Sequence, residues 1–180
     1  MARFVFADDG IDFDGHSIDK GPLGGVESSL INLTKELAKL GHEVLVRNHC
    51  QSAQIIDGVN WAPLSHDMPS EADVFVANRG DQLITLMPNA GQTIFWTHNP
   101  AKYLLKRRYL YKIWRYQPII VFIGDYHAST YPIWAPGRRR KTIPYGISAE
   151  FMNVPQLERP PSPRAIFTSN PLRSLSWLLE

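Results

Sequence analysis

The sequence has little cysteine, with Cys50 as the single thiol among 180 residues. One thiol cannot form an internal disulfide, and with His49 beside it but no second thiol it does not make a cysteine-based zinc site. No run reaches the roughly 18 to 20 apolar residues that a membrane-spanning helix needs, and the chain starts on an apolar strand instead of a charged-then-apolar leader. We therefore expect a cytoplasmic protein that needs no metal or cofactor, with any membrane contact peripheral.

The sequence also lacks the G-x-G-x-x-G fingerprint of dinucleotide-binding domains. The Gly24-Gly25 pair follows the first apolar stretch by roughly sixteen residues, whereas the fingerprint requires a tight turn. This spacing disfavours a simple NAD-binding domain. The overall composition, 44% hydrophobic and 20% charged, is typical of one medium-sized globular domain.

The first fifty residues predict half of a nucleotide-binding fold. A strand over 2–7 is followed by a helix over 26–40, which Gly24 and Gly25 open, and by a strand over 42–47. A helix that starts on two glycines presents free backbone N–H groups to whatever lies in front, which suits an anion such as phosphate. The same pair also fits plain loop and cap chemistry, and both interpretations stay open.

The rest of the chain alternates between predicted strands and helices. Strands are predicted over 59–64, 72–77, 92–97 and 118–123, and helical segments over 81–87 and 101–116. Because the strands are apolar without alternation, we expect a Rossmann-like α/β fold: a parallel sheet, helices on both faces, and ligands at the carboxyl ends of the strands. Gly24, His98 and Gly124 would then gather on one rim of the sheet.

The end of the sequence predicts a domain boundary. Proline is dense over 154–163 and no periodicity is present, which indicates an extended linker. A strand over 164–168 and a helix over 171–180 follow, and the apolar face of that helix has no predicted partner. We expect a first domain over 1–153 and, from 164 to 180, the start of a second domain of a longer protein.

Three segments occur in the order that is found in a known family. Gly24-Gly25-Val26-Glu27 matches a G-G-x-E signature, a strand ends at Phe95–His98, and 142–151 occupies the place of I-P-N-G-[IV]-D-x-x-x-F. In the order of these segments the chain resembles the amino-terminal domain of glycosyltransferase family 4. The members of this family are retaining sugar transferases of the GT-B fold. The resemblance implies a nucleotide-sugar donor, a glycan or lipid-linked acceptor, and an acceptor-side domain that is inactive without a donor-side domain.

The resemblance also implies roles for single residues. Gly24 and Gly25 would face the donor diphosphate, and Arg173 would add a cation from the second domain, although Asn170 stands where arginine is more common. His98 would face the transferred sugar as the catalytic-site histidine, with Asn99 in place of the family's usual aspartate. From the residues alone, His98 equally fits a strand-end histidine that local hydrogen bonds satisfy.

The loop that follows the first strand is acidic, with five aspartates against one lysine over 8–20. A solvated, mobile loop is the default interpretation. In the family's fold this loop borders the acceptor, so the acceptor contacts would come from Asp9, Asp12, Asp14 or His16. Tyr145, which replaces the family's asparagine before Gly146, either lines the site or merely packs.

The predicted helix over 101–116 has six basic residues and no acidic one. They are Lys102, Lys106, Arg107, Arg108, Lys112 and Arg115. Interleaved Tyr103, Tyr109, Tyr111 and Trp114 suit an anionic lipid surface. The alternative is an ordinary sheet-covering helix with Leu110, Ile113 and Trp114 as its core seam. The basic run over 138–141 predicts a solvated turn.

Together these features predict a glycosyltransferase that adds a sugar to a glycan or lipid-linked acceptor in polysaccharide or lipopolysaccharide synthesis. An anionic membrane surface is an expected partner, and nucleic acid is not. The principal alternative is a non-catalytic Rossmann-like module that binds glycan, membrane or a partner chain. A small nucleotide-dependent enzyme of the doubly wound class is a more distant alternative.

Overall fold

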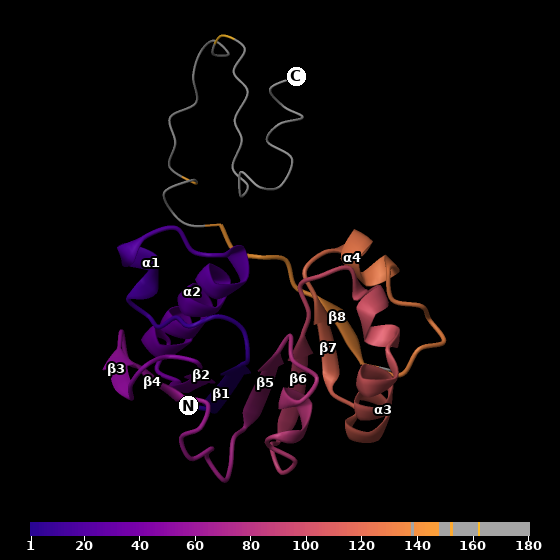
Figure 1. The fold of residues 1–180 in the computed structure, drawn as a ribbon, viewed down its shortest axis with the longest axis horizontal. Helices are drawn as coiled ribbons and strands as arrows, with labels where there is room; N and C mark the ends of the chain where they lie inside the picture. The colour runs from indigo at the N-terminus through magenta and orange to yellow at the C-terminus, as the bar shows by residue number, and fades with distance from the viewer. Residues whose placement is uncertain (138, 148–151, 153–161, 163–180) are drawn as a thin grey trace. The chain divides into compact units, whose positions relative to one another are not determined.

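The computed structural model describes residues 1–137, 139–147, 152 and 162. The chain divides into two compact units, Met1–Gly146 and Ile147–Glu180. The fold below is that of the first unit (Figure 1). Apart from Ser162, the predicted linker and the predicted second-domain elements, Arg173 among them, lie outside the described residues.

Eight described strands form one sheet in the order β3-β4-β2-β1-β5-β6-β7-β8. They are β1 (Arg3–Asp8), β2 (Glu43–Asn48), β3 (Gln54–Ile56), β4 (Val59–Pro63), β5 (Val74–Asn78), β6 (Gln92–Trp96), β7 (Ile119–Phe122) and β8 (Arg140–Thr142). All neighbours pair in parallel except β3 and β4. The order reverses between β1 and β5, and the carboxyl edge at such a reversal is where open α/β sheets bind ligands.

Helices cover both faces of this sheet, as the sequence predicts. On one face α2 (Gly25–Lys39) packs through Leu30 and Ile31. On the other face lies α3 (Arg107–Tyr116), which buries Tyr109 and Ile113. Alternate residues of β1 enter the two cores, because successive side chains of a strand point to opposite faces: Phe6 joins the α2 side, while Val5 and Ala7 join the α3 side. The Rossmann-like α/β prediction is confirmed.

The predicted helix over 101–116 is wrong as a single element. A 3₁₀ segment η2 (Ala101–Leu105) and α3 are separated by Lys106, whose backbone is extended at φ −65° and ψ 139°. Leu104 and Ile113 both have no exposed surface. Nine residues apart in one continuous helix, they would lie on opposite faces. The break lets both side chains enter the same core.

Two further element predictions need correction. The helical segment over 81–87 is only the short 3₁₀ turn η1 (Leu83–Thr85). The basic run over 138–141 is not a solvated turn throughout, because Arg140 and Lys141 belong to β8. The Arg140 guanidinium donates to the carbonyls of Pro132, Ala135 and Gly137 at 3.0, 2.6 and 2.9 Å, and so holds the 131–137 loop.

The sequence reasoning missed the short elements β3, β8, α1 (Ser17–Lys20) and α4 (Asp125–Ser129). Each spans three to five residues, too few to show a periodicity. In the part of the chain that the structure describes, no helix is both long enough and apolar enough to cross a bilayer.

Candidate functional site

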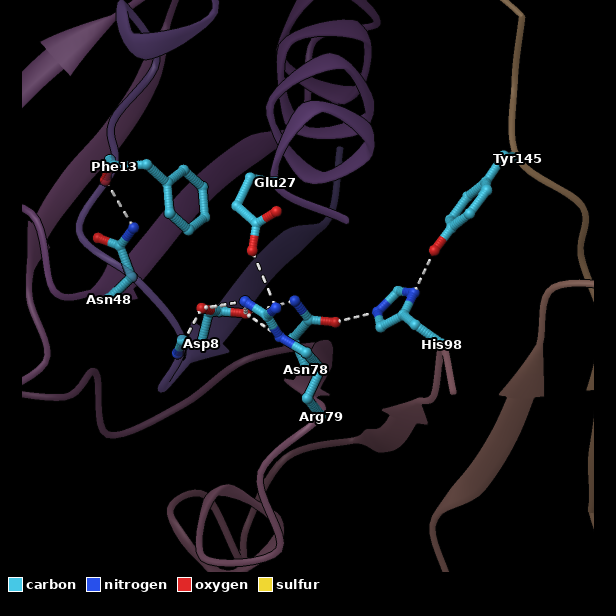
Figure 2. Close-up of polar contacts among 9 residues, drawn as sticks. Asp8, Phe13, Glu27, Asn48, Asn78, Arg79, His98 and Tyr145 are labelled. Carbon is cyan, nitrogen blue, oxygen red and sulfur yellow. Dashed lines mark hydrogen bonds and ion pairs between the residues drawn. The ribbon is translucent and has the colours of Figure 1, made fainter. Parts of the chain in front are cut away.

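A buried ionic cluster occupies the carboxyl edge of the sheet at the point where the strand order reverses (Figure 2). Asp8 ends β1, Asn78 ends β5, and neither has any exposed surface. Arg79, the next residue, bends back toward Asp8 in the left-handed conformation at φ 69°. Its Nη2 lies 2.8 and 2.9 Å from the two Asp8 carboxylate oxygens, and its Nε lies 3.2 Å from Oδ2.

Glu27 completes the cluster from the first turn of α2. Its Oε1 accepts from Arg79 Nη1 at 2.9 Å, so one guanidinium joins β1, β5 and α2. The side chains of Asp8 and Glu27 are 0% and 7% exposed, and that of Arg79 is 25% exposed. Burial by itself lowers the pKa of Arg79, but the two carboxylates outweigh it and the pKa lies above its usual value. The three groups together carry one net negative charge.

The two glycines at the start of α2 serve different purposes. Gly24 is the N-cap of the helix, and a Cβ there would overlap Glu27 Oε2, so a side chain at this position would require the Glu27 carboxylate to turn. Gly25 has open space within 4 Å of any added Cβ. Both residues are exposed, and the cap makes no side-chain hydrogen bond to the helix N–H groups. The helix mouth is therefore open in front of Gly25, whereas Gly24 is explained by packing.

His98 follows β6 and is tied to the cluster through Asn78. Its Nε2 lies 2.5 Å from Asn78 Oδ1, and its Nδ1 lies 2.6 Å from the Tyr145 hydroxyl. The Trp96 ring lies 4.7 Å from the imidazole between ring centroids. Burial, with Arg79 and His127 adding to it, lowers the pKa of His98 to about 3. The imidazole is thus neutral and hydrogen-bonded at both nitrogens, and Tyr145 does contact it.

The acidic loop over 8–20 makes hydrogen bonds within itself and to β2, which a fully solvated loop would not. Asn48 at the end of β2 donates to the Phe13 carbonyl at 2.7 Å (Figure 2). Asp14 accepts from the Ser17 hydroxyl at 3.1 Å and from the His16 backbone N–H at 2.9 Å. Burial raises the pKa of Asp14, but these hydrogen bonds outweigh it and the pKa lies below its usual value. The default interpretation is wrong for Asp14 and for the buried Asp8.

The remaining acceptor candidates in this loop are exposed. Asp12 and His16 are open to solvent, and Asp12 has the Gln51 amide at 3.4 Å. Asp9 is also exposed, and its carboxylate lies where a Cβ on Gly80 would be. Partial burial of the carboxylate, together with the neighbouring Asp8, raises the pKa of Asp9. Asp9 is therefore beside the ionic cluster, while Asp14 lies toward β3 through its hydrogen bond from Gln54.

The six predicted basic residues are divided among η2, the break and α3. Arg108 and Lys112 both approach Asp81, at 3.4 and 2.8 Å. Trp114 is not part of the core seam, because 62% of it is exposed, as is 62% of Tyr111. Ile113 is buried as predicted, Leu110 is only half-buried, and Tyr109 makes the other core contact of α3.

Sequence reasoning missed Asp8, Asn78 and Arg79 as site residues. A signal was present, because Asp8 directly follows the predicted strand over 2–7 and Asn78-Arg79 directly follows the one over 72–77. Polar residues at the ends of two parallel apolar strands meet at one edge of the sheet. What the sequence could not show is that these two strands are neighbours.

The sequence matches no protein-family model and no curated protein. Among solved structures, the fold is similar to that of WaaG, a glycosyltransferase involved in lipopolysaccharide biosynthesis, with a TM-score of 0.50 and 15% identity. This likeness supports the Rossmann-like α/β fold that the strand order shows. The match covers 82% of this chain and 46% of the WaaG chain, so the chain spans less than half the length of that glycosyltransferase. In the described residues, no three His, Cys, Asp or Glu side chains are placed to hold a metal ion.

We predict that Arg79→Met will lower the free energy of unfolding by about 3–5 kcal/mol, because it leaves two buried carboxylates unpaired. Urea unfolding measures the loss. Arg3→Met is the matched control, since the Arg3–Glu43 pair is about two-fifths exposed and water screens it. Equal free energies of unfolding for Arg79→Met and Arg3→Met would contradict a stabilising role of the Arg79 cluster.

Proposed function

We propose that this chain is the acceptor-side part of a GT-B glycosyltransferase, which transfers a sugar from a nucleotide-sugar donor with retention of configuration. The observation that supports this most is the common location of the open helix mouth at Gly25, His98 and the Arg79 cluster. All three lie at the carboxyl edge of a sheet whose fold is similar to that of the glycosyltransferase WaaG. Family 4 remains the proposed family.

The reaction breaks the bond between the sugar and the diphosphate, so negative charge grows on the leaving group and positive charge on the sugar ring. In the proposal, the backbone N–H groups at the start of α2 face the diphosphate. Glu27 belongs to the first turn of this helix and Asp8 joins it through Arg79, which neutralises one of the two carboxylate charges. A second domain, which residues 164–180 would begin and in which Arg173 would reach the phosphates, supplies the other donor contacts in the proposal.

His98 is proposed to face the transferred sugar. With its pKa lowered to about 3 it carries no charge near neutral pH, so it does not protonate a leaving group there. A neutral imidazole can instead accept a hydrogen bond from a sugar hydroxyl and hold the ring in place. We assign His98 this orienting role.

The acceptor is proposed to bind along the loop that follows β1. Asp9, Asp12 and His16 are exposed there and can accept or exchange hydrogen bonds with sugar hydroxyls. Asp14 would first have to release Ser17, so we rank it below the other three. A glycan or a lipid-linked glycan has the hydroxyls that this loop would bind.

We predict that Gly25→Val in the complete enzyme will lower turnover of the nucleotide sugar by at least tenfold, with the fold retained. A valine side chain there has room in the structure but holds the helix mouth away from a phosphate. Nucleoside diphosphate release measures turnover, and circular dichroism checks the fold. Gly21→Val is the matched control, because Gly21 also has open space but lies outside α2. Full turnover by the Gly25 variant would refute the assignment.

We also propose that the enzyme docks peripherally on the cytoplasmic face of an anionic membrane, where a lipid-linked acceptor would be available. Lys102, Lys106, Arg107 and Arg115 make no ion pair with any described residue. A shallow pocket is lined by both Trp114 and Trp134, and Trp134 is 74% exposed. Exposed tryptophans beside unpaired cations suit the interface of an anionic bilayer.

We predict that vesicles containing phosphatidylserine will retain the chain at low salt, and that vesicles of phosphatidylcholine alone will not. Arg107→Gln with Arg115→Gln should weaken retention by about 25-fold, at about fivefold for each cation near the surface. Lys35→Gln with Lys39→Gln removes the same charge from α2, where both lysines are already paired, and should have little effect. An equal loss of vesicle retention in both double variants would rule out α3 as the membrane-binding surface.

The non-catalytic module remains the second candidate, and the same exposed surface favours it. A complete protein that binds glycan or anionic vesicles, but releases no diphosphate from any nucleotide sugar, would support the module and contradict the transferase.

A further inference from the structure

A chain of four hydrogen-bonding side chains leads from the buried edge of the sheet to Tyr145, and each link fixes the next (Figure 2). The Asp8 carboxylate can only accept, so the Asn78 amide nitrogen faces it, at 2.5 Å from Oδ2. The Asn78 carbonyl oxygen therefore faces His98, and this oxygen can also only accept.

It follows that His98 Nε2 carries the imidazole proton and donates it to Asn78. Nδ1 of the neutral ring then has a lone pair, and the Tyr145 hydroxyl donates to it at 2.6 Å. Arg79 contributes indirectly to this tautomer, because its contacts with both Asp8 oxygens fix the carboxylate that orients Asn78. Asn78 is thus a positioning residue, which sets the tautomer without touching a ligand.

Tyr145 is less buried than Asp8 and Asn78, which begin this series of hydrogen bonds. It is half-buried, and residues 141–144, 146 and 147 around it are exposed. Within the described residues, the hydroxyl contact with His98 is the hydrogen bond that attaches the Tyr145 side chain. The ring also packs at the edge of Trp96, with 6.3 Å between ring centroids.

We propose that the Tyr145 hydroxyl occupies the position of a ligand hydroxyl on His98 Nδ1, so that Tyr145 and a sugar hydroxyl compete for one acceptor. The phenol and an alcohol both offer an O–H donor to the same lone pair, so the exchange replaces one hydrogen bond with another of similar strength. The ligand class is a hexose that presents a free hydroxyl. This inference rests on the proposed function, in which His98 faces the transferred sugar.

The first test is the protonation of His98 in the unsubstituted, ¹⁵N-labelled chain, followed by long-range ¹H–¹⁵N NMR. Between about pH 5 and 8 we expect a protonated Nε2 and an unprotonated Nδ1, because the pKa of His98 is lowered to about 3. Tyr145→Phe should shift the Nδ1 resonance while the tautomer stays the same. A proton on Nδ1 in the unsubstituted chain overturns the inference.

The second test is competition, with free glucose, galactose and mannose as the probes and the His98 Nδ1 resonance as the readout. Tyr145→Phe should lower the hexose concentration at half-saturation by about 2- to 10-fold, since it removes one competing hydrogen bond. Tyr103→Phe is the matched control, because its hydroxyl bonds Thr97 at 2.7 Å and not His98. The inference is overturned if the Tyr145 variant binds no more tightly than the control, or if no hexose moves the resonance.

These outcomes are separable from those of the proposed function. A complete enzyme that transfers a sugar while His98 carries its proton on Nδ1 overturns only the competition. A chain with the expected tautomer and the tighter hexose binding, in a complete protein without transfer, overturns only the transferase.

Discussion

The pairing of Arg79 with Asp8 and Glu27 is the interaction on which the rest of the site depends. It joins the ends of two central strands to the first turn of α2, and so fixes where the mouth of that helix lies relative to the sheet. Breaking a buried pair of this kind leaves a charge without a partner, which costs several kcal/mol. The left-handed backbone of Arg79 and the bare Cα of Gly24 are both accommodations to this cluster.

The cluster also determines the charge near the proposed donor site. Two carboxylates lie close to a helix start that is proposed to face a diphosphate, and both would repel it if they were unpaired. Arg79 neutralises one of these two charges, and in the proposal the N–H groups at Gly25 face the diphosphate. On the other side, Asn78 binds both Asp8 and His98 and so orients the neutral imidazole, whose Nδ1 accepts from Tyr145 or, in the proposal, from a sugar hydroxyl. One guanidinium thereby serves both ends of the proposed donor site.

Much of the fold could be predicted from the sequence, because apolar runs and helical spacing fix β1, α2, β2 and β5–β7 within about two residues. The break at Lys106 could not, since only the finished core shows that Leu104 and Ile113 must face the same way. The site residues likewise divide into those that the sequence predicts and those that it does not. The glycine pair and His98 stand out locally, whereas Arg79 gains its meaning from residues about fifty and seventy positions away.

The stereochemistry of the product tests the central claim most directly. The complete protein would be incubated with a panel of nucleotide α-hexoses and a glycan acceptor, and the new glycosidic bond examined by ¹H NMR. We expect release of nucleoside diphosphate and an α bond in the product, as in the donor. A β bond would contradict the retaining GT-B assignment, and a panel from which no sugar is transferred would contradict the transferase itself.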